Sequence, residues 1–569
     1  MSLNKMMNIM KLRKNYHCVV IGQGALAIRC CQFLIDSGIY IDAILSLDSV
    51  FTSWSKKEEV KYLNSISELE LFVCDNSIEW LFSISYPLIF NSRLLNNIKL
   101  GSFNYHDAPL PKYTGYHATS WAIFSLEKKY SINWHRVIFK VDVGDIAVQK
   151  NVDITPLDTA FSLNIKCHHA AFEGFKKLIF LIKSENIEYT KQDLSERNFF
   201  SSQKRPYSLA CLQWKKTAEE LSALVRGLYF GEHYPNPLCM PKFYLMSTVV
   251  IVKNLEILSN TSHEKSGILV DISQDFLVIT TATTDIKVEF MQLEGEYFGA
   301  DFLAYQLDIN IGDTLPTLSE YDCDDITREH ENLVSYESFW VERLESSKPL
   351  RTILENQECH YQDCIFDIYY KWSLYDEIIG FKNEDRLLHI LGALAVYLSK
   401  SNNTQHFHLA WKTNLFKNKN LNYSIFFSDS VPFEFYINLN GTAFDLYNSI
   451  SIEYASVNKY KTFTEDIKFR YPKLRLSEFL NSKFIFGIDV INYENIEDNP
   501  IGSESGGKTN SFLTMQIEPT KRVFRWVSNS SFFSSLELTK MADEIINIDK
   551  ILLSNPTNSL RELFYGEFD

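Results

Sequence analysis

Three patterns are missing from this sequence, and each absence argues against a class of protein. The ten cysteines are scattered and form no Cys-x-x-Cys pair, which argues against a metal site and against a disulfide framework. Every long apolar stretch is interrupted by charges, so no membrane-spanning helix is expected. No dense run of Lys and Arg occurs, so nucleic acid is not an expected partner.

The N-terminus, the charge distribution and the length predict the cellular location of the protein and its number of domains. Residues 1–16 are basic but lack the apolar region and cleavage site of a secretory signal, and with reduced thiols this predicts a cytoplasmic protein. The net charge is −15, yet residues 1–250 hold 28 Lys and Arg against 23 Asp and Glu, so the acidity lies downstream. With 46% apolar residues in a length of 569, we expect three or four domains of about 100–200 residues.

Apolar periodicity predicts an α/β chain made of several bodies. A strand at 17–22, a helix at 25–36 and a strand at 40–47 are typical of the start of a Rossmann-like parallel sheet. A long helical pattern covers 159–183, with Asp158 as its expected cap. The predicted segments are an N-terminal tail (1–16), a Rossmann-like domain (17–200), a small OB-like β-barrel (201–315), an acidic linker (316–334) and a separate C-terminal α/β body (335–569).

A glycine-rich turn follows the first predicted strand. Gly22-Gln23-Gly24, with Ala27 in the third place of a GxGxxG/A pattern, opens a helix as a dinucleotide site would require. Asp42 or Asp48 could supply the acidic residue that such a site needs about twenty positions later. The alternative is a tight strand-to-helix turn without a nucleotide, and we favour it because the rest of the chain needs no nicotinamide.

A second segment carries residues suited to acyl transfer. Asn104 and His106 are two positions apart, so on a strand their side chains share a face, and Asp142 follows in Val-Asp-Val-Gly-Asp-Ile. Acyl transfer to an amine needs a donor for the oxyanion, a base for the ammonium proton and a carboxylate beside that base. Asn, His and Asp can fill these places. On spacing alone, a loop histidine beside an ordinary turn aspartate is an equal alternative.

The runs 103–121 and 131–146 resemble the catalytic core of the folate-dependent formyltransferases, a family that includes methionyl-tRNA formyltransferase and sugar formyltransferases. The family pattern is Asn-x-His, then Leu-Pro-x-Tyr-x-Gly, then Asp-x-Gly-Asp-Ile. This resemblance implies a Rossmann-like catalytic domain over 17–200 and a C-terminal barrel over 201–315. It also implies that the chain transfers formyl from 10-formyltetrahydrofolate to an amine, with Asn104, His106 and Asp142 as catalytic residues.

The same resemblance implies which residues contact the folate. They are Phe82, Ser83, Ile84, Ser85 and Tyr86 in the family's folate-binding loop, together with His135, Gly144 and Asp145. One position departs from the family pattern, because Thr114 stands where the family has Arg between Tyr and Gly. This departure puts the contacts made there in doubt, not the chemistry.

The rest of the chain resembles peptide-synthetase machinery. Residues 146–149 and 164–167 are most similar to the formylation domains of nonribosomal peptide synthetases. The order of apolar motifs after residue 335 is similar to the second lobe of condensation domains, which have a chloramphenicol acetyltransferase-like fold. The string His-His-Ala-Ala-Phe-Glu-Gly at 168–174 nearly spells the condensation motif, but it lies mid-helix, so we expect these histidines to be structural or exposed.

These resemblances imply an acceptor and partners. The favoured acceptor is an aminoacyl group on a carrier protein, with adenylation or carrier domains as partners and a homodimer left open. An amino sugar nucleotide is the alternative acceptor, and a non-catalytic folate-binding assembly scaffold is the alternative function. With no first lobe before residue 335, the C-terminal body is expected to dock a partner and to form no peptide bond.

Overall fold

The structure is a computed structural model, and it places side chains and backbone over most of the chain. The ranges it describes are 16–86, 90–245, 248–262, 265–292, 299–350, 368–371, 383–416, 425–481, 484–491, 511–521, 523–528 and 533–565. Within these ranges no helix has the length and apolar character needed to cross a bilayer. The cysteines in these ranges are free thiols.

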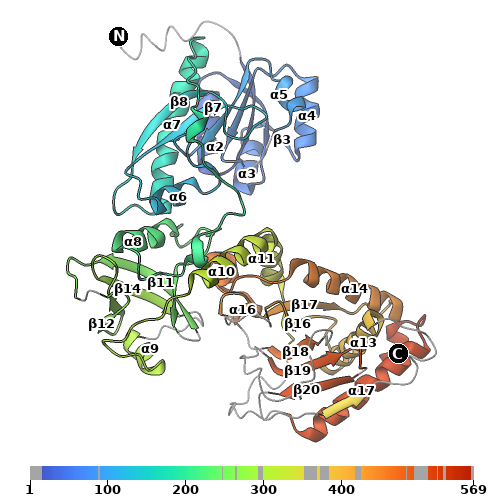
Figure 1. Cartoon of the computed structure of the whole chain (residues 1–569). Helices are drawn as coiled ribbons and strands as arrows, with labels where there is room; N and C mark the ends of the chain where they lie inside the picture. The colour runs from blue at the N-terminus through green and yellow to red at the C-terminus, as the bar shows by residue number, and fades with distance from the viewer. Residues whose placement is uncertain are drawn as a thin grey trace.

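The N-terminal domain is built on a seven-stranded sheet of order β3-β2-β1-β4-β5-β7-β8, seen at the top of Figure 1. Strands β1 to β5 are parallel, β7 is antiparallel to β5, and β8 is antiparallel to β7. The strands of this sheet are β1 (His17–Gly22), β2 (Tyr40–Leu45), β3 (Lys61–Leu63), β4 (Trp80–Ile84), β5 (Gly101–His106), β7 (Lys129–Arg136) and β8 (Ile146–Asp153). Strands β6 (Thr114–Gly115) and β9 (Phe199–Phe200) form a separate two-stranded sheet. The helices are α2 (Gly24–Asp36), α3 (Ser49–Lys57), α4 (Ile66–Asp75), α5 (Ser92–Asn96), α6 (Ala118–Phe124) and α7 (Ala160–Lys183).

Alternating side chains divide this sheet between two cores. Val20, Phe82 and Phe103 pack on the side of α2 and α7, whereas Val19 and Leu81 pack on the side of α4 and α5. This alternation is the period of two expected for a strand buried on both faces. The Rossmann-like prediction for this domain is therefore confirmed, and β1 has the predicted bounds.

The cap of the long helix α7 differs from the prediction. Thr159, not Asp158, is the N-cap, because its hydroxyl accepts the Ser162 N–H in a capping box. The Asp158 carboxylate instead accepts hydrogen bonds from the Thr155 backbone and from the Ser162 hydroxyl. His168 and His169 are exposed on this helix, as expected for histidines outside any site.

The second domain contains a five-stranded antiparallel sheet of order β10-β11-β14-β13-β12. Its strands are β10 (Lys242–Leu245), β11 (Thr248–Ile257), β12 (Leu269–Ile272), β13 (Phe276–Ile279) and β14 (Ile286–Gln292). Its helices are α8 (Ala218–Gly227) and α9 (Ala300–Gln306). The predicted barrel is thus a curled sheet with β10 and β12 at its two edges. Figure 1 shows α8 between this sheet and the catalytic domain.

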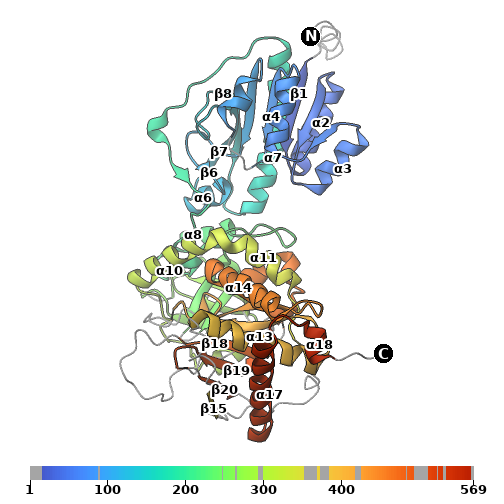
Figure 2. The same ribbon diagram turned by 90° about the vertical axis from the view of Figure 1, so that its right-hand side faces the viewer.

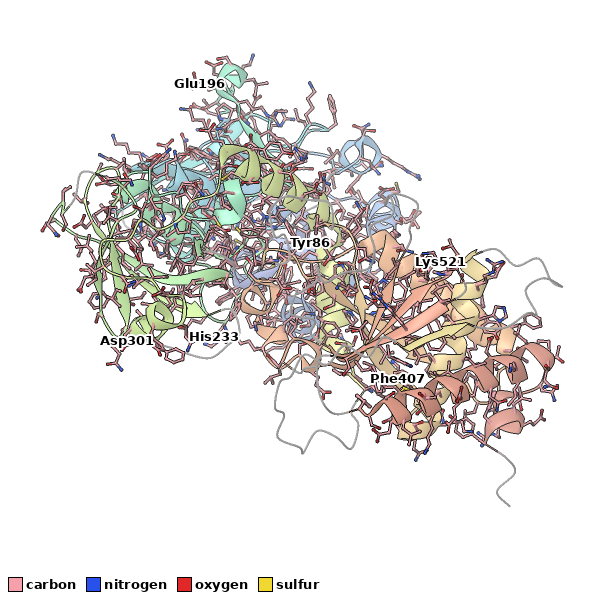
Figure 3. All side chains as sticks on the ribbon, turned by 60° about the horizontal axis from the view of Figure 1, so that its bottom comes forward. Tyr86, Glu196, His233, Asp301, Phe407 and Lys521 are labelled. Atoms are coloured by element: carbon pink, nitrogen blue, oxygen red, sulfur yellow. The ribbon has the colours of Figure 1, made fainter. Side chains whose placement is uncertain are left out.

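The C-terminal body contains a six-stranded mixed sheet of order β15-β20-β19-β18-β16-β17. Its strands are β15 (Ile368–Lys371), β16 (His406–Lys412), β17 (Ser430–Tyr436), β18 (Phe484–Val490), β19 (Ser511–Glu518) and β20 (Val523–Ser528). Its helices are α11 (Glu337–Ser346), α13 (Asn383–Asn402), α14 (Ala443–Tyr460), α15 (Ile467–Arg470), α16 (Glu478–Asn481), α17 (Ser535–Ser554) and α18 (Leu560–Phe564). Figure 2 shows α13, α14 and α17 against this sheet, and Figure 3 labels Phe407 of β16, which belongs to its core.

The predicted acidic linker is wrong as a structural description. Residues 320–333 form helix α10 (Glu320–Leu333), capped by Ser319. Its buried residues Cys323, Ile326 and Leu333 recur at helical spacing and pack in one cluster with Cys239 of the second domain and Phe427 of the C-terminal body. The other acidic residues lie on the remaining face of this amphipathic helix, whereas Asp325 is buried. The second domain and the C-terminal body therefore share a core, and Figure 1 shows α10 and α11 at their junction.

Buried charges cross the same junction. Lys242 of β10 lies 2.9 Å from the Asp466 carboxylate, and Arg470 of α15 donates to that carboxylate at 2.9 Å. Arg470 also pairs with Glu337 of α11. Burial alone would raise the pKa of Asp466, but Lys242, Arg470 and the Met240 N–H together hold it below its usual range. Each charge therefore has a partner, as buried charges require.

Candidate active site

Three predicted site residues lie side by side at one end of the catalytic sheet. Asn104 and His106 are near the end of β5 and face the same side of it. In the antiparallel pairing of β5 with β7, His135 is directly opposite Asn104. In the parallel pairing with β4, Ser83 is the neighbour of Asn104 on the other side. The carboxyl ends of parallel strands are where open α/β sheets bind ligands.

Asp142 reaches this row from the loop between β7 and β8. Its backbone has φ of 56°, a left-handed conformation that is uncommon outside glycine. A side chain at Gly144 would place its Cβ 1.8 Å from the Arg136 carbonyl oxygen, so only glycine fits there. The Arg136 N–H also donates to the Asp145 carbonyl at 2.9 Å. The close approach to Arg136 explains the glycine of Asp-x-Gly-Asp in this loop.

The Asp142 carboxylate lies between two imidazoles. Its Oδ2 is 3.7 Å from His106 Nδ1, and its Oδ1 is 3.5 Å from His135 Nε2. The Gly115 N–H donates to Oδ2 at 3.2 Å. All three side chains are less than a tenth exposed. Burial acts to raise the pKa of Asp142, but His106, His135 and the Gly115 N–H outweigh it and lower that pKa well below its usual range, so the carboxylate is ionised.

The hydrogen bonds of the imidazoles assign their protons. His106 Nε2 lies 3.1 Å from the Tyr113 carbonyl oxygen, to which it can only donate, so neutral His106 has its lone pair on Nδ1, facing Asp142. His135 Nδ1 likewise donates to the Arg136 carbonyl at 2.9 Å. His135 Nε2 then accepts from the Asn104 amide at 3.3 Å. His106 Nδ1 is a proton acceptor beside an anion, and Asn104 keeps a second amide hydrogen that no described residue engages.

The residues predicted to contact the folate differ in burial and in the groups that they could offer to a ligand. Phe82 and Ile84 are fully buried and belong to the core between the sheet and α7, so only their backbones could meet a ligand. Ser83 is also buried, and its hydroxyl has no hydrogen-bond partner among the described residues. Ser85 and Tyr86 are partly exposed at the end of β4. Gly144 and Asp145 shape the Asp142 loop through their backbones.

In the glycine-rich turn, the backbone donor that would bind a phosphate is already bonded to a side chain of the protein. The Gly24 N–H, at the start of α2, donates to the Asp48 carboxylate at 2.8 Å. The other oxygen of Asp48 caps α3 by accepting from the Val50 N–H at 2.9 Å. Helix N-termini of this kind are where dinucleotide pyrophosphates bind. A carboxylate of the chain occupies that position here.

We therefore predict that the protein binds neither NAD(H) nor NADP(H). A pyrophosphate would have to displace the Asp48 carboxylate from the Gly24 N–H and would meet its negative charge. Isothermal titration calorimetry with each nucleotide checks this expectation. Saturable micromolar binding of any of them would contradict it.

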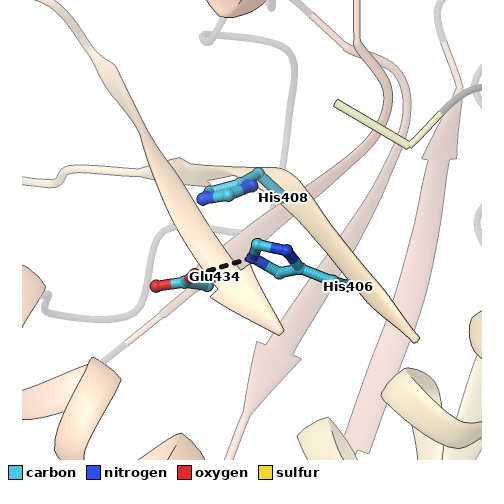
Figure 4. Close-up of side chains that lie close together, drawn as sticks. All are labelled: His406, His408 and Glu434. Atoms are coloured by element: carbon cyan, nitrogen blue, oxygen red, sulfur yellow. Dashed lines mark hydrogen bonds and ion pairs between the residues drawn. The ribbon is translucent and has the colours of Figure 1, made fainter. Parts of the chain in front are cut away.

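A second group of titratable side chains lies in the C-terminal body and was not noted from the sequence. His406 and His408 of β16 and Glu434 of β17 point toward one another (Figure 4), with possible ligand atoms within 4.8 Å. The Lys348 N–H donates to His408 Nδ1 at 3.0 Å, so neutral His408 carries its proton on Nε2 and offers no lone pair there. Burial lowers the pKa of His408 to about 4, which keeps it neutral.

The surroundings of Glu434 also oppose a cation. Glu434 pairs with His406 at 2.7 Å and lies 3.4 Å from the Arg343 guanidinium. Arg343 in turn binds Glu453 of α14, which accepts the Glu434 N–H at 3.1 Å. A side chain thus satisfies a backbone donor of the edge strand β17, as sheet edges require. We interpret this group as an ion-pair network that covers the edge of the sheet.

A Rossmann-like sheet whose strand ends bring together an amide donor, an imidazole and a buried carboxylate has the groups that acyl transfer requires. Comparison with family models makes the class specific. Residues 68–179 match the formyl transferase family, and residues 206–298 match the formyl transferase C-terminal domain. The N-terminal half of the chain therefore contains regions similar to both domains of that family. The matches fall within the predicted domains 17–200 and 201–315.

Solved structures of similar proteins include formyltransferases. The N-formyltransferase of Helicobacter canadensis, in complex with folinic acid and dTDP-3-aminofucose, is 18% identical over 49% of this chain and 100% of that one, with a TM-score of 0.40. WlaRD, a sugar 3N-formyltransferase, is 17% identical over 49% of this chain and 99% of that one, with a TM-score of 0.39. HypX of Aquifex aeolicus with tetrahydrofolic acid is 11% identical over 54% of this chain and 50% of that one, with a TM-score of 0.37.

We predict that Asp142→Asn lowers kcat by about a hundredfold or more, because the amide keeps the acceptor for Gly115 but loses the charge beside His106. Initial rates at saturating formyl-folate test this effect. A variant with wild-type kcat would contradict it.

Proposed function

We propose that the chain transfers a formyl group from 10-formyltetrahydrofolate to an amine at the Asn104–His106–Asp142 site. The observation that carries the proposal is the ionised Asp142 carboxylate, held 3.7 Å from an imidazole nitrogen that is free to take a proton. The formyl transferase domain matches support it. The folate fits the donor set, because Asn104 has an unused amide hydrogen and Ser83 an unpartnered hydroxyl in the same row.

The residues divide the chemistry of this transfer. As the acceptor nitrogen bonds to the formyl carbon, the carbonyl oxygen becomes an oxyanion, and the free N–H of Asn104 donates to it. His106 Nδ1 takes the proton from the new ammonium group, and Asp142 stabilises the resulting imidazolium. When the bond from the formyl carbon to the folate nitrogen breaks, His106 returns this proton to that nitrogen. The products are a formamide and tetrahydrofolate, and no other reactant is needed.

We propose an aminoacyl group on a carrier protein as the acceptor. The resemblance of residues 335–569 to the second lobe of condensation domains supports this choice, because such lobes belong to peptide-synthetase chains. The mixed six-stranded sheet with α13, α14 and α17 fits a lobe of that kind. An amino sugar nucleotide, the acceptor class of other formyltransferases, is the alternative.

One assay separates these acceptors. Full-length protein is incubated with formyl-folate and an aminoacyl-loaded carrier protein in one reaction, and with formyl-folate and a dTDP-amino sugar in another. The masses of the products are measured by mass spectrometry. A formyl mass increment on the carrier-bound amino acid supports the proposal, and an increment on the sugar favours the alternative. Tight folate binding without transfer to either acceptor would point to a binding scaffold.

A further inference from the structure

Gln192, which follows α7 and which the sequence pattern did not single out, contacts the loop that carries Asp142. Its side-chain amide donates to the Asp142 carbonyl at 3.1 Å and to the Gly144 carbonyl at 2.7 Å. An amide nitrogen has two hydrogens, and both are used here. One side chain therefore ties together the two carbonyls on either side of Val143.

Backbone bonds hold the two ends of the loop, because the Val137 N–H donates to the Ser102 carbonyl at 2.8 Å and the Arg136 N–H donates to the Asp145 carbonyl at 2.9 Å. The apolar residues of the loop, Ile138, Phe139 and Val141, are exposed, so their packing contributes little to its conformation. Asp142 itself is in the left-handed region, which a non-glycine residue adopts only when its surroundings enforce it. Between these ends, the contacts that hold the turn are the two bonds from Gln192, the close approach of Gly144 to Arg136 and the bond from the Gly115 N–H to the Asp142 carboxylate.

Gln192 is well anchored for this task. Two residues earlier, Thr190 exchanges a pair of backbone hydrogen bonds with Ile146, at 2.8 and 2.9 Å. Ile146 is the first residue of β8, in the catalytic sheet. Gln192 is thus connected through Thr190 to the catalytic sheet and through its side chain to the loop that carries Asp142.

We propose that Gln192 is a positioning residue for formyl transfer, which holds the 137–145 loop so that the Asp142 carboxylate stays between His106 and His135. The proposal rests on the proposed function of that site. Gln192 acts through the backbone of Asp142 and does not touch the reacting atoms. Without it, the loop relaxes and the carboxylate moves away from the imidazoles.

The test uses two variants of the full chain and a matched control. Gln192→Met keeps the length of the side chain but removes both donors, and Gln192→Glu keeps the shape but places a carboxylate beside two carbonyls. Gln149→Met is the control, because Gln149 is an exposed residue of neighbouring β8 whose amide donates to Ser131 and not to the loop. For all three variants, kcat and KM of formyl transfer and the hydrogen exchange of residues 137–145 are measured.

We expect both Gln192 variants to lower kcat about tenfold to a hundredfold with KM for formyl-folate nearly unchanged. The 137–145 amides should exchange faster, because the two bonds from the Gln192 amide are lost. Gln149→Met should match wild type. Unchanged exchange in Gln192→Met, or a rise in KM for formyl-folate with an unchanged kcat, overturns the proposal. Absence of transfer by the wild-type protein instead overturns the proposed function, while exchange still decides whether Gln192 holds the loop.

Discussion

His106→Ala is expected to lower kcat for formyl transfer by about 10²–10⁴-fold, the contribution typical of a general base, while formyl-folate still binds. The reason is geometric. His106 Nδ1 is the nitrogen left unprotonated by the bond to Tyr113, and it faces the Asp142 carboxylate at 3.7 Å. Alanine removes the proton acceptor but leaves Asn104 and His135 in place. Steady-state rates and a separate folate titration by fluorescence or calorimetry distinguish loss of chemistry from loss of binding.

The matched control is His169→Ala, which removes an exposed histidine of α7 from the same domain. It should keep wild-type kcat and wild-type folate affinity. Turnover of His106→Ala within a factor of about ten of wild type would remove His106 from the role of base. Equal losses in the two variants would show that the effect is not specific to the site.

Much of the catalytic domain could be predicted because its signals are local. The apolar run 17–22, ended by glycine, is β1, and the period of two places Asn104 and His106 on one face of β5. The approach of His135 to Asn104 follows from the antiparallel pairing of β5 and β7, which no local pattern encodes. The role of Gln192 depends on a loop fifty residues away, so it became visible only in the folded chain.

The errors at the junction have a physical origin. The linker was predicted from the number of acidic residues over 316–334. The apolar residues Cys323, Ile326 and Leu333 recur at helical spacing and form one face of a helix, and this pattern was not taken into account. The Ser319 cap was a readable signal for the start of this helix. The pairing of Lys242 with Asp466 joins residues 224 positions apart, and a lysine and an aspartate at such separation look like ordinary surface charges in a sequence. The C-terminal body was therefore taken to be more independent than it is.

The buried charges at this junction lead to the second large effect. Asp466→Ala leaves Lys242 and Arg470 buried with one partner fewer each, and breaking such a group typically destabilises a protein by about 3–5 kcal/mol. We expect the midpoint of urea unfolding to fall accordingly. Lys242 belongs to the second domain and Asp466 to the C-terminal body. The loss of stability should therefore appear in the unfolding of both bodies together. Circular dichroism and tryptophan fluorescence follow the transition.

A surface pair provides the control for that comparison. Lys473 and Glu345 form an ion pair within the C-terminal body, but their side chains are 43% and 48% exposed. Lys473→Met should therefore cost less than about 1 kcal/mol. The double variant Lys242→Met/Asp466→Leu removes the buried pair as a whole and should be more stable than Asp466→Ala alone. If Asp466→Ala unfolds at the wild-type urea concentration, the buried network does not hold the two bodies together.

The pH dependence of unfolding is an independent test of the ion pair at Asp466. The folded pKa of Asp466 lies below its usual range because Lys242 and Arg470 outweigh the effect of burial, so the unfolded chain takes up this proton first as the pH falls. The stability contributed by the pair is complete above the unfolded pKa of about 3.9 and is lost progressively below it. The difference in unfolding free energy between wild type and Asp466→Ala should therefore be constant near neutral pH and shrink below about pH 4. A difference that grows on acidification would mean that Asp466 is protonated in the folded protein, and the ion-pair explanation of the junction would fail.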